Sequence, residues 1–293
     1  MSKKEKHSEL TALISLLDEP NTEMYRSIRE KIASYGKSAI PLLEEAWLDA
    51  NEPGDVRRIE HLIDNIRFDD LYFELKNWKE FHSDDLIKAF LLMTTFRFPD
   101  LDVDRYKLLS DRLRQNIWLE INEDLTALEK VKVLNHIFYE VYKFRGRLPQ
   151  QINLNDYFLN TLIDTKKGSA IALGILYAGL AQSIDIPIYG VDLHHHFALA
   201  YMDDTIDRKR PEDYSEDDVL FYIAVVNQGS VFTKNEIRHY LKQLEIKEKP
   251  GFFLPASNTS VINKLIVQVA DAYMKEGKED KAQLLDKLGA ALD

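Results

Sequence analysis

The chain has 293 residues, of which 45% are hydrophobic and 30% charged, as is usual for a folded globular protein. Its net charge of -11 argues against a protein that wraps nucleic acid, because phosphate contacts need clustered lysine and arginine. The absence of cysteine excludes disulfides, thiolate metal ligands and a cysteine nucleophile. Neither a signal peptide nor a run of roughly 18 apolar residues is present, so we expect a cytoplasmic protein without membrane contact.

Residues 1–68 alternate helical patterns with turn signals. Pro20 interrupts the first apolar stripe, and the segment 52–55 interrupts a later one, so the pattern predicts two pairs of helices. Two pairs of similar length resemble degenerate HEAT-like repeats. A plain four-helix cap explains the pattern equally well, because two units are too few to establish a period.

Residues 69–143 also read as helical, and the pattern changes in residues 144–245. A helix from 169 to about 183 is apolar nearly all round, which predicts a central buried helix. Three strand patterns follow, at 186–193, 196–201 and 219–226, and a charged loop spans 203–218. A helix followed by antiparallel strands predicts an α+β core, and residues 246–293 predict a closing helical hairpin.

The order of motifs around this helix resembles the transglutaminase-like superfamily. A helix led by Gly168 runs into Ile186-Pro187, and a strand then leads to His196-Phe197. The resemblance implies a papain-like core in which a cysteine, a histidine and an aspartate cooperate. The cysteine position falls at Ala170, the histidine at His196 and the aspartate at Ala224. Since an alanine has no lone pair for attack, this triad is vestigial.

A closer resemblance is to the SirB-type branch of that superfamily, which also lacks the cysteine. The matching segments cover about residues 70–240, and the tail 246–293 is similar to a single tetratricopeptide-like hairpin. The matched motifs are Phe98 to Asp102, Phe144-Arg145-Gly146, Asn155 with Tyr157 to Asn160, Gly190-Val191-Asp192 and His196-Phe197. The chain departs most where the branch has D-P-F-N-G-G, because it reads Ala224 to Gly229 there.

Two catalytic alternatives remain open. Ser169 stands beside the vacant position and could attack with His196 as base, although a serine at a helix start is also a good N-cap. Asp192, His194 and His196 share strand parity and could hold a metal, although a zinc site needs three or four ligands. We favour the cap and an inherited, metal-free His196.

Several polar residues line the expected cleft. Asparagines before the buried helix brace loops more often than they bind ligands, and Arg145 either fastens its own loop or binds an anion. We read Gly168, Gly190 and Gly229 as turn residues, since no phosphate-binding glycine motif is present. The cleft candidates are Asn155, Tyr157, Asn160, Gly168, Ser169, His194, His196 and Asn227.

These observations predict a non-catalytic transglutaminase-like protein that acts as an adaptor or regulator. Its partner would be another protein or a peptide, and no cofactor, metal or nucleic acid is expected. The alternative is a hydrolase that uses Ser169 with His196, or a metal near His194 and His196. The sequence does not indicate the oligomeric state.

Overall fold

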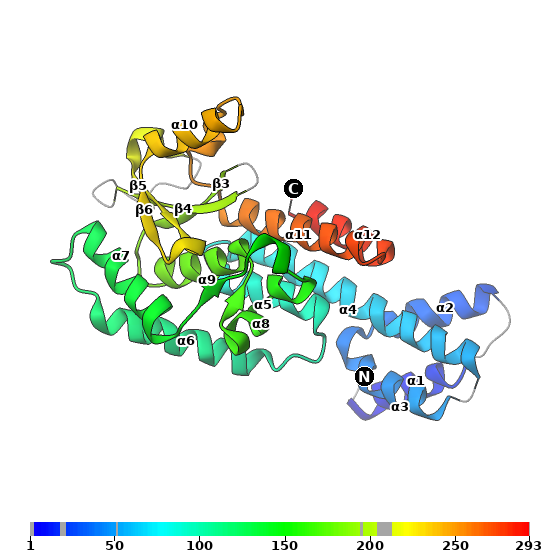
Figure 1. Ribbon diagram of the computed structural model, residues 1–293. Coiled ribbons are helices and arrows are strands. Elements are labelled where there is room, and N and C mark those ends of the chain that lie inside the picture. Colours follow the sequence, from blue (N-terminus) through cyan, green and yellow to red (C-terminus); the bar gives the residue numbers. More distant parts are fainter. Residues whose placement is uncertain (1–2, 18–21, 51, 194–195, 204–212, 293) are drawn as a thin grey trace. The chain divides into compact units, whose positions relative to one another are not determined.

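The computed structural model describes residues 3–17, 22–50, 52–193, 196–203 and 213–292. The chain divides into two compact units, residues 1–74 and 75–293, and a long helix contributes to both (Figure 1). His194 and most of the predicted charged loop lie outside the described residues. Among the described residues, no helix is both long and apolar enough to cross a bilayer.

The first unit is helical, as the sequence predicts. Apolar side chains from all of its helices pack together in one core, in which Ile32, Leu43 and Leu62 are almost fully buried. Ser38 lies in a 3-10 turn, where its hydroxyl donates to the carbonyl of Tyr35. The elements are α1 (Lys3–Ile14), α2 (Thr22–Ala33), η1 (Gly36–Ala39), α3 (Ile40–Asp49) and α4 (Pro53–Phe81).

Helix α4 runs without a break through residue 68, where the sequence reading placed the end of the cap, and the compact units divide after Glu74. No Gly or Pro interrupts α4 after its first turn, so nothing in the backbone stops the helix there.

The second unit begins with helices that precede the core in the chain, several of which pack against its central helix. Asp85, Asp102 and Thr126 cap α5, α6 and α7 through their side-chain oxygens, as expected for these residue types. A π-helix, η2, directly continues α7. The elements are α5 (Leu86–Arg97), α6 (Val103–Glu120), α7 (Ala127–Asn135), η2 (His136–Val141), β1 (Arg145–Gly146), η3 (Pro149–Gln151), η4 (Leu154–Tyr157), α8 (Leu159–Thr165) and β2 (Lys167–Gly168).

Helix α9 (Ala170–Gln182) is the centre of this unit, and every residue from Ile171 to Ala181 is buried. An all-round apolar helix needs partners on every side, and α9 has them in α5, α6, α8 and the sheet. The prediction of a central buried helix is confirmed.

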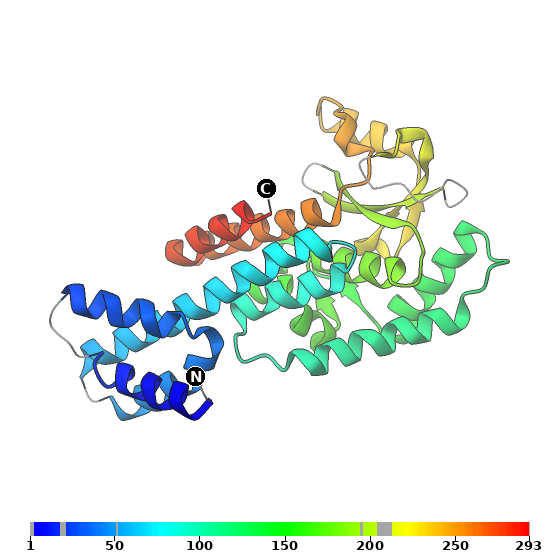
Figure 2. The same cartoon turned by 180° about the vertical axis from the view of Figure 1, so that it is seen from behind.

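A four-stranded antiparallel sheet in the order β3-β4-β5-β6 packs on α9. Helix α10 lies on the other face of this sheet, so the core has three layers (Figures 1 and 2). The fold is α+β, as predicted, with an extra strand, β6, that the sequence reading missed. The elements are β3 (Ile188–Leu193), β4 (His196–Met202), η6 (Glu216–Asp218), β5 (Val219–Ala224), η7 (Val225–Asn227), β6 (Ser230–Phe232), α10 (Lys234–Gln243) and η8 (Pro250–Phe252).

A helical hairpin, α11 (Asn258–Lys275) and α12 (Glu279–Ala290), closes the chain, as the sequence predicts. Gly277, with a φ of +72°, supports the turn between the two helices. Helix α11 also contacts β3, α5 and η4, so the hairpin belongs to the second unit.

Candidate functional site

The start of α9 is the place where the superfamily carries its nucleophile. Ala170 is the first residue of the helix and is half-buried. Ser169 is 2% exposed, and its Oγ accepts the backbone N–H of Ala172 at 3.3 Å. The N-cap interpretation of Ser169 is therefore confirmed, and the hydroxyl oxygen is directed at the helix it caps.

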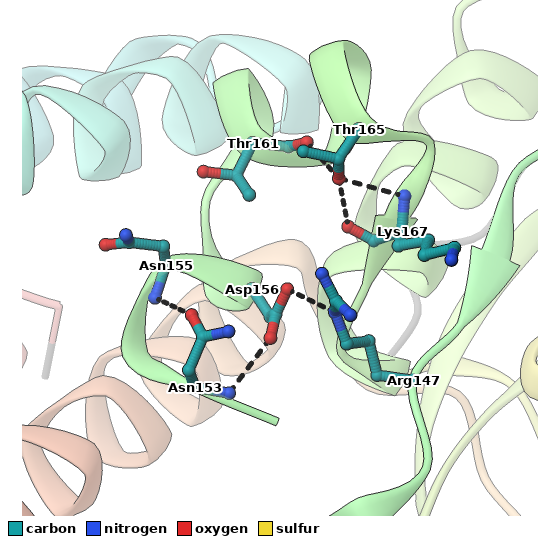
Figure 3. A network of polar contacts seen from close by, with 7 residues as sticks. All are labelled: Arg147, Asn153, Asn155, Asp156, Thr161, Thr165 and Lys167. Atoms are coloured by element: carbon teal, nitrogen blue, oxygen red, sulfur yellow. Dashed lines mark hydrogen bonds and ion pairs between the residues drawn. The ribbon is translucent and has the colours of Figure 1, made fainter. Parts of the chain in front are cut away.

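The segment before α9 is held by a buried carboxylate that the sequence reading overlooked. Asp156 is fully buried and accepts from Arg147 Nε at 2.8 Å and from the Asn153 N–H at 2.9 Å (Figure 3). Its main-chain oxygen accepts the N–H of Ser169 at 2.8 Å. Asp156 thus fixes the backbone that presents Ser169 and Ala170.

Two short strands tie this segment to the preceding loop. β1 pairs with β2 in parallel, so that Gly146 lies beside Gly168. Arg145 Nη1 donates to the carbonyl oxygens of Tyr139 at 2.5 Å and Phe144 at 2.7 Å. The interpretation of Arg145 as a loop fastener is confirmed. Gly168 lies in β2 rather than in a turn.

Thr165 stabilises the same loop from the end of α8. Its hydroxyl lies 2.7 Å from the carbonyl of Thr161 and accepts the N–H of Lys167 at 3.2 Å (Figure 3). The backbone entering α9 is therefore fixed from both sides, which preorganises the start of the helix.

His196 lies on the sheet face that carries α10. It is exposed, and its ring meets that of Tyr240 edge-on at 5.4 Å. Side chains alternate along β4, so the next residue, Phe197, points to the opposite face and contacts α9 at Gly174. Phe197, not His196, therefore faces the helix that begins at Ala170.

The proposed metal ligands do not share a face. Leu193 pairs with His196 and Asp192 pairs with Phe197, so Asp192 and His196 point to opposite sides of the sheet. Asp192 forms an ion pair with Lys264 of α11. The shared parity that the sequence reading assumed is wrong, because the chain reverses between Leu193 and His196. Within the described residues, no group of three or more metal-ligating side chains is present.

The β5–β6 turn stands where the superfamily has its aspartate segment, and Asn135 holds this turn by a hydrogen bond. Ala224 lies two residues after Tyr222 and shares its face, the α10 face. Asn135 Nδ2 donates to the carbonyl of Gly229 at 2.9 Å, and the Tyr177 hydroxyl donates to Asn135 Oδ1 at 3.0 Å. Burial raises the pKa of Tyr177 well above its usual range, so this hydroxyl stays a donor.

The glycines around the sheet have different roles. Gly229 is a turn residue with a φ of +72°, as predicted. Gly190 lies inside β3, and the turn interpretation is wrong there. A Cβ atom at position 190 would lie 2.6 Å from Val261 and 2.8 Å from the Phe197 ring, so glycine is needed for close packing.

The remaining cleft candidates are spread over two regions. Asn155 Oδ1 accepts from Arg97 at 3.3 Å, and burial is the main cause of the raised pKa of Tyr157. The Oδ1 atom of Asn160 is buried without a hydrogen-bond partner among the described residues. Asn227 is exposed and donates to Ser230 Oγ at 3.0 Å, at the far end of β5.

A buried helix packed on a small antiparallel sheet is the α+β arrangement of transglutaminase-like proteins. The model of the transglutaminase-like superfamily matches residues 105–267, which is more than half of the chain, so the protein belongs to this superfamily.

Two curated relatives, both called UPF0162 protein, come from strains 9a5c and Temecula1 of Xylella fastidiosa. They are 20% and 24% identical to this chain over 203 residues, which cover 67% of the chain and 68% of each relative. No solved structure matches the chain significantly.

Proposed function

We propose that this protein is a non-catalytic member of the superfamily and works by binding another protein or a peptide. The observation that carries the proposal is the separation of the two inherited positions. Ala170 begins α9, whereas His196 points to the α10 face of the sheet. A histidine on that face cannot act as a base for a group at the start of α9, because general-base catalysis needs hydrogen-bond contact.

The serine hydrolase alternative lacks an activated nucleophile. Ser169 is 2% exposed and uses its oxygen as an N-cap, and its neighbours Asp156 and Arg147 form a structural ion pair. A serine nucleophile requires a base in contact with its hydroxyl. Labelling with a fluorophosphonate probe tests this alternative directly. We expect no labelling of the wild-type protein; labelling that disappears in Ser169→Ala would overturn the proposal.

A metal hydrolase is the other alternative. His194 lies outside the described residues, and Asp192 is engaged by Lys264 on the face opposite to His196. Metal analysis of protein purified without chelator tests it. We expect less than a tenth of an equivalent of zinc, whereas one equivalent that is lost in His196→Ala would support the hydrolase.

We also propose that the chain belongs to the SirB-type branch and has its domain order. The proposed parts are a HEAT-like cap at 1–68, a transglutaminase-like domain at 69–245 and a tetratricopeptide-like hairpin at 246–293. The helices α1–α4 and the hairpin α11–α12 support this order. These helical parts would offer surface for partners.

A further inference from the structure

A large groove of the second unit lies at the carboxyl end of α9, opposite to the end that carries Ala170. It has a volume of about 1510 Å³ and is lined by α5, α6, the end of α9 and the start of β3. Small-molecule pockets usually measure about 300–1,000 Å³. The groove is therefore large enough for several residues of an extended peptide.

The floor of the groove is apolar. It includes Ile87, Leu92 and Pro187, which are all partly exposed. Helices α5 and α9 approach closely beneath it, because a Cβ atom at Gly179 would lie 2.7 Å from Ile87 Cδ1. This floor can accept aliphatic chain segments.

The rim of the groove is acidic. Among the described lining residues, seven side chains are acidic and three are basic. The Nε atom of Arg114 lies 3.6 Å from Oδ1 of Asp111, so these two charges compensate each other and leave six acidic and two basic side chains. Glu80, Asp84 and Asp104 are exposed, and the described part of the chain offers them no ion-pair partner. The negative end of the α9 dipole points to the same place.

The groove is also built to keep its shape. Asn258 Nδ2 donates to the Ser83 carbonyl at 2.9 Å and to Gln182 Oε1 at 2.8 Å. Gln182 Nε2 donates in turn to the Ile188 carbonyl at 2.8 Å. These bonds connect the α4–α5 loop, the end of α9 and β3, so a ligand would meet a preorganised surface.

We infer that this groove binds an extended, lysine- or arginine-rich segment of a partner protein. The aliphatic stems of these side chains would lie on the apolar floor, and their charged ends would reach the rim carboxylates. A second copy of this chain is a poor occupant, because two proteins of net charge -11 repel each other. The inference rests on the proposed binding function and names the partner's chemistry.

Fluorescence anisotropy with three labelled ten-residue peptides tests this inference. The peptides share leucine at alternate positions and carry lysine, glutamine or glutamate at the others. We expect the lysine peptide to bind at least tenfold more tightly than the glutamine peptide and to weaken with salt, and the glutamate peptide not to bind. Equal binding of all three peptides would overturn the inference.

Matched variants locate the binding. Neutralising the rim with Glu80→Gln, Asp84→Asn and Asp104→Asn should weaken the lysine peptide about tenfold. The control carries Glu120→Gln, Glu123→Gln and Asp286→Asn, which are exposed, lie outside the groove and remove the same charge. An equal loss in the control would overturn the inference, as would dimerisation of the protein that the rim variant abolishes.

The two proposals fail in different ways. Cleavage of a bound peptide that requires His196 would overturn the non-catalytic function and leave the ligand class of the groove intact. If the lysine peptide fails to bind and no hydrolase activity is detected, only the inference about the ligand of the groove is overturned.

Discussion

The ring of Phe197 fills the space beside Gly174: a Cβ atom at position 174 would lie 2.3 Å from Cε1 of this ring. Phe197 is therefore on the face of β4 that packs on α9, and Gly174 lies one helical turn after Ala170. This contact packs an apolar ring of the sheet against the buried helix, and His196, the neighbour of Phe197, points to the opposite face.

Gly174→Ala should destabilise the protein by about 1–3 kcal/mol, because the added methyl group displaces a packed ring. Chemical denaturation monitored by circular dichroism measures this change. Gly251→Ala is the matched control, since nothing lies within 4 Å of a Cβ atom there. If the two variants are equally stable, Phe197 does not pack against α9 as described.

Asp156→Asn should cost about 2–3 kcal/mol of folding free energy. One carboxylate oxygen of Asp156 accepts from Arg147 and the other from the N–H of Asn153, whereas an asparagine keeps only one acceptor oxygen and places a donor NH2 group at the second position. Asp286→Asn, at an exposed position of α12, should change stability by less than about 0.5 kcal/mol. A free energy of unfolding that falls no more for Asp156→Asn than for the control would contradict this role.

Gly229→Ala should also destabilise, since its φ of +72° and the Asn135 side chain, 1.9 Å from a Cβ atom, both oppose a methyl group. The combination with Asn135→Ala should relieve the clash but keep the backbone cost. A double-mutant cycle should therefore give a coupling of about 1 kcal/mol. Strict additivity would show that Asn135 and the β5–β6 turn are not in contact.

Tyr222→Phe should alter the alkaline stability of the protein. Burial raises the pKa of Tyr222 to about 12, so stability from this group is present below pH 10 and is lost between about pH 10 and 12. The hydroxyl also donates to the Phe253 carbonyl at 2.8 Å. The variant should be slightly less stable at pH 7 but lose stability less steeply above pH 10. Urea denaturation at several pH values measures the free energy of unfolding. If this free energy falls with pH above 10 as steeply in Tyr222→Phe as in the wild type, the assignment is refuted.

The sequence predicted correctly those elements whose residue pattern is compatible with only one kind of structure. Helix α9 is apolar on all sides, so a buried central position was the only stable outcome. Ser169 at its start was a good N-cap for local reasons, because the interaction reaches only to Ala172. The α+β class followed from the three strand patterns.

The sequence could not fix features that depend on chain reversal. Parity counting from Asp192 to His196 fails because β3 ends at Leu193 and β4 starts at His196, with the chain direction reversed between them. The face of His196 could be known only from the pairing register.

The Asp156–Arg147 pair was missed for a similar reason. Arg147 directly follows the two-residue strand β1 and Asp156 lies in the short 3-10 helix η4, and neither element has a sequence signal that would bring the two side chains together. The groove at the end of α9 combines α5, α6 and β3, so no local pattern could indicate it.

The reactivity of a thiol placed at the vacant position tests the central claim most directly. In Ala170→Cys the introduced thiol is the only one in the chain, because the protein contains no cysteine. Its pKa can be measured from the pH dependence of alkylation by iodoacetamide, with and without His196→Ala. An imidazole in contact with a thiol lowers the thiol's pKa by more than about one unit. The account predicts the same thiol pKa in both proteins, and a rise of one unit or more on His196→Ala would contradict it.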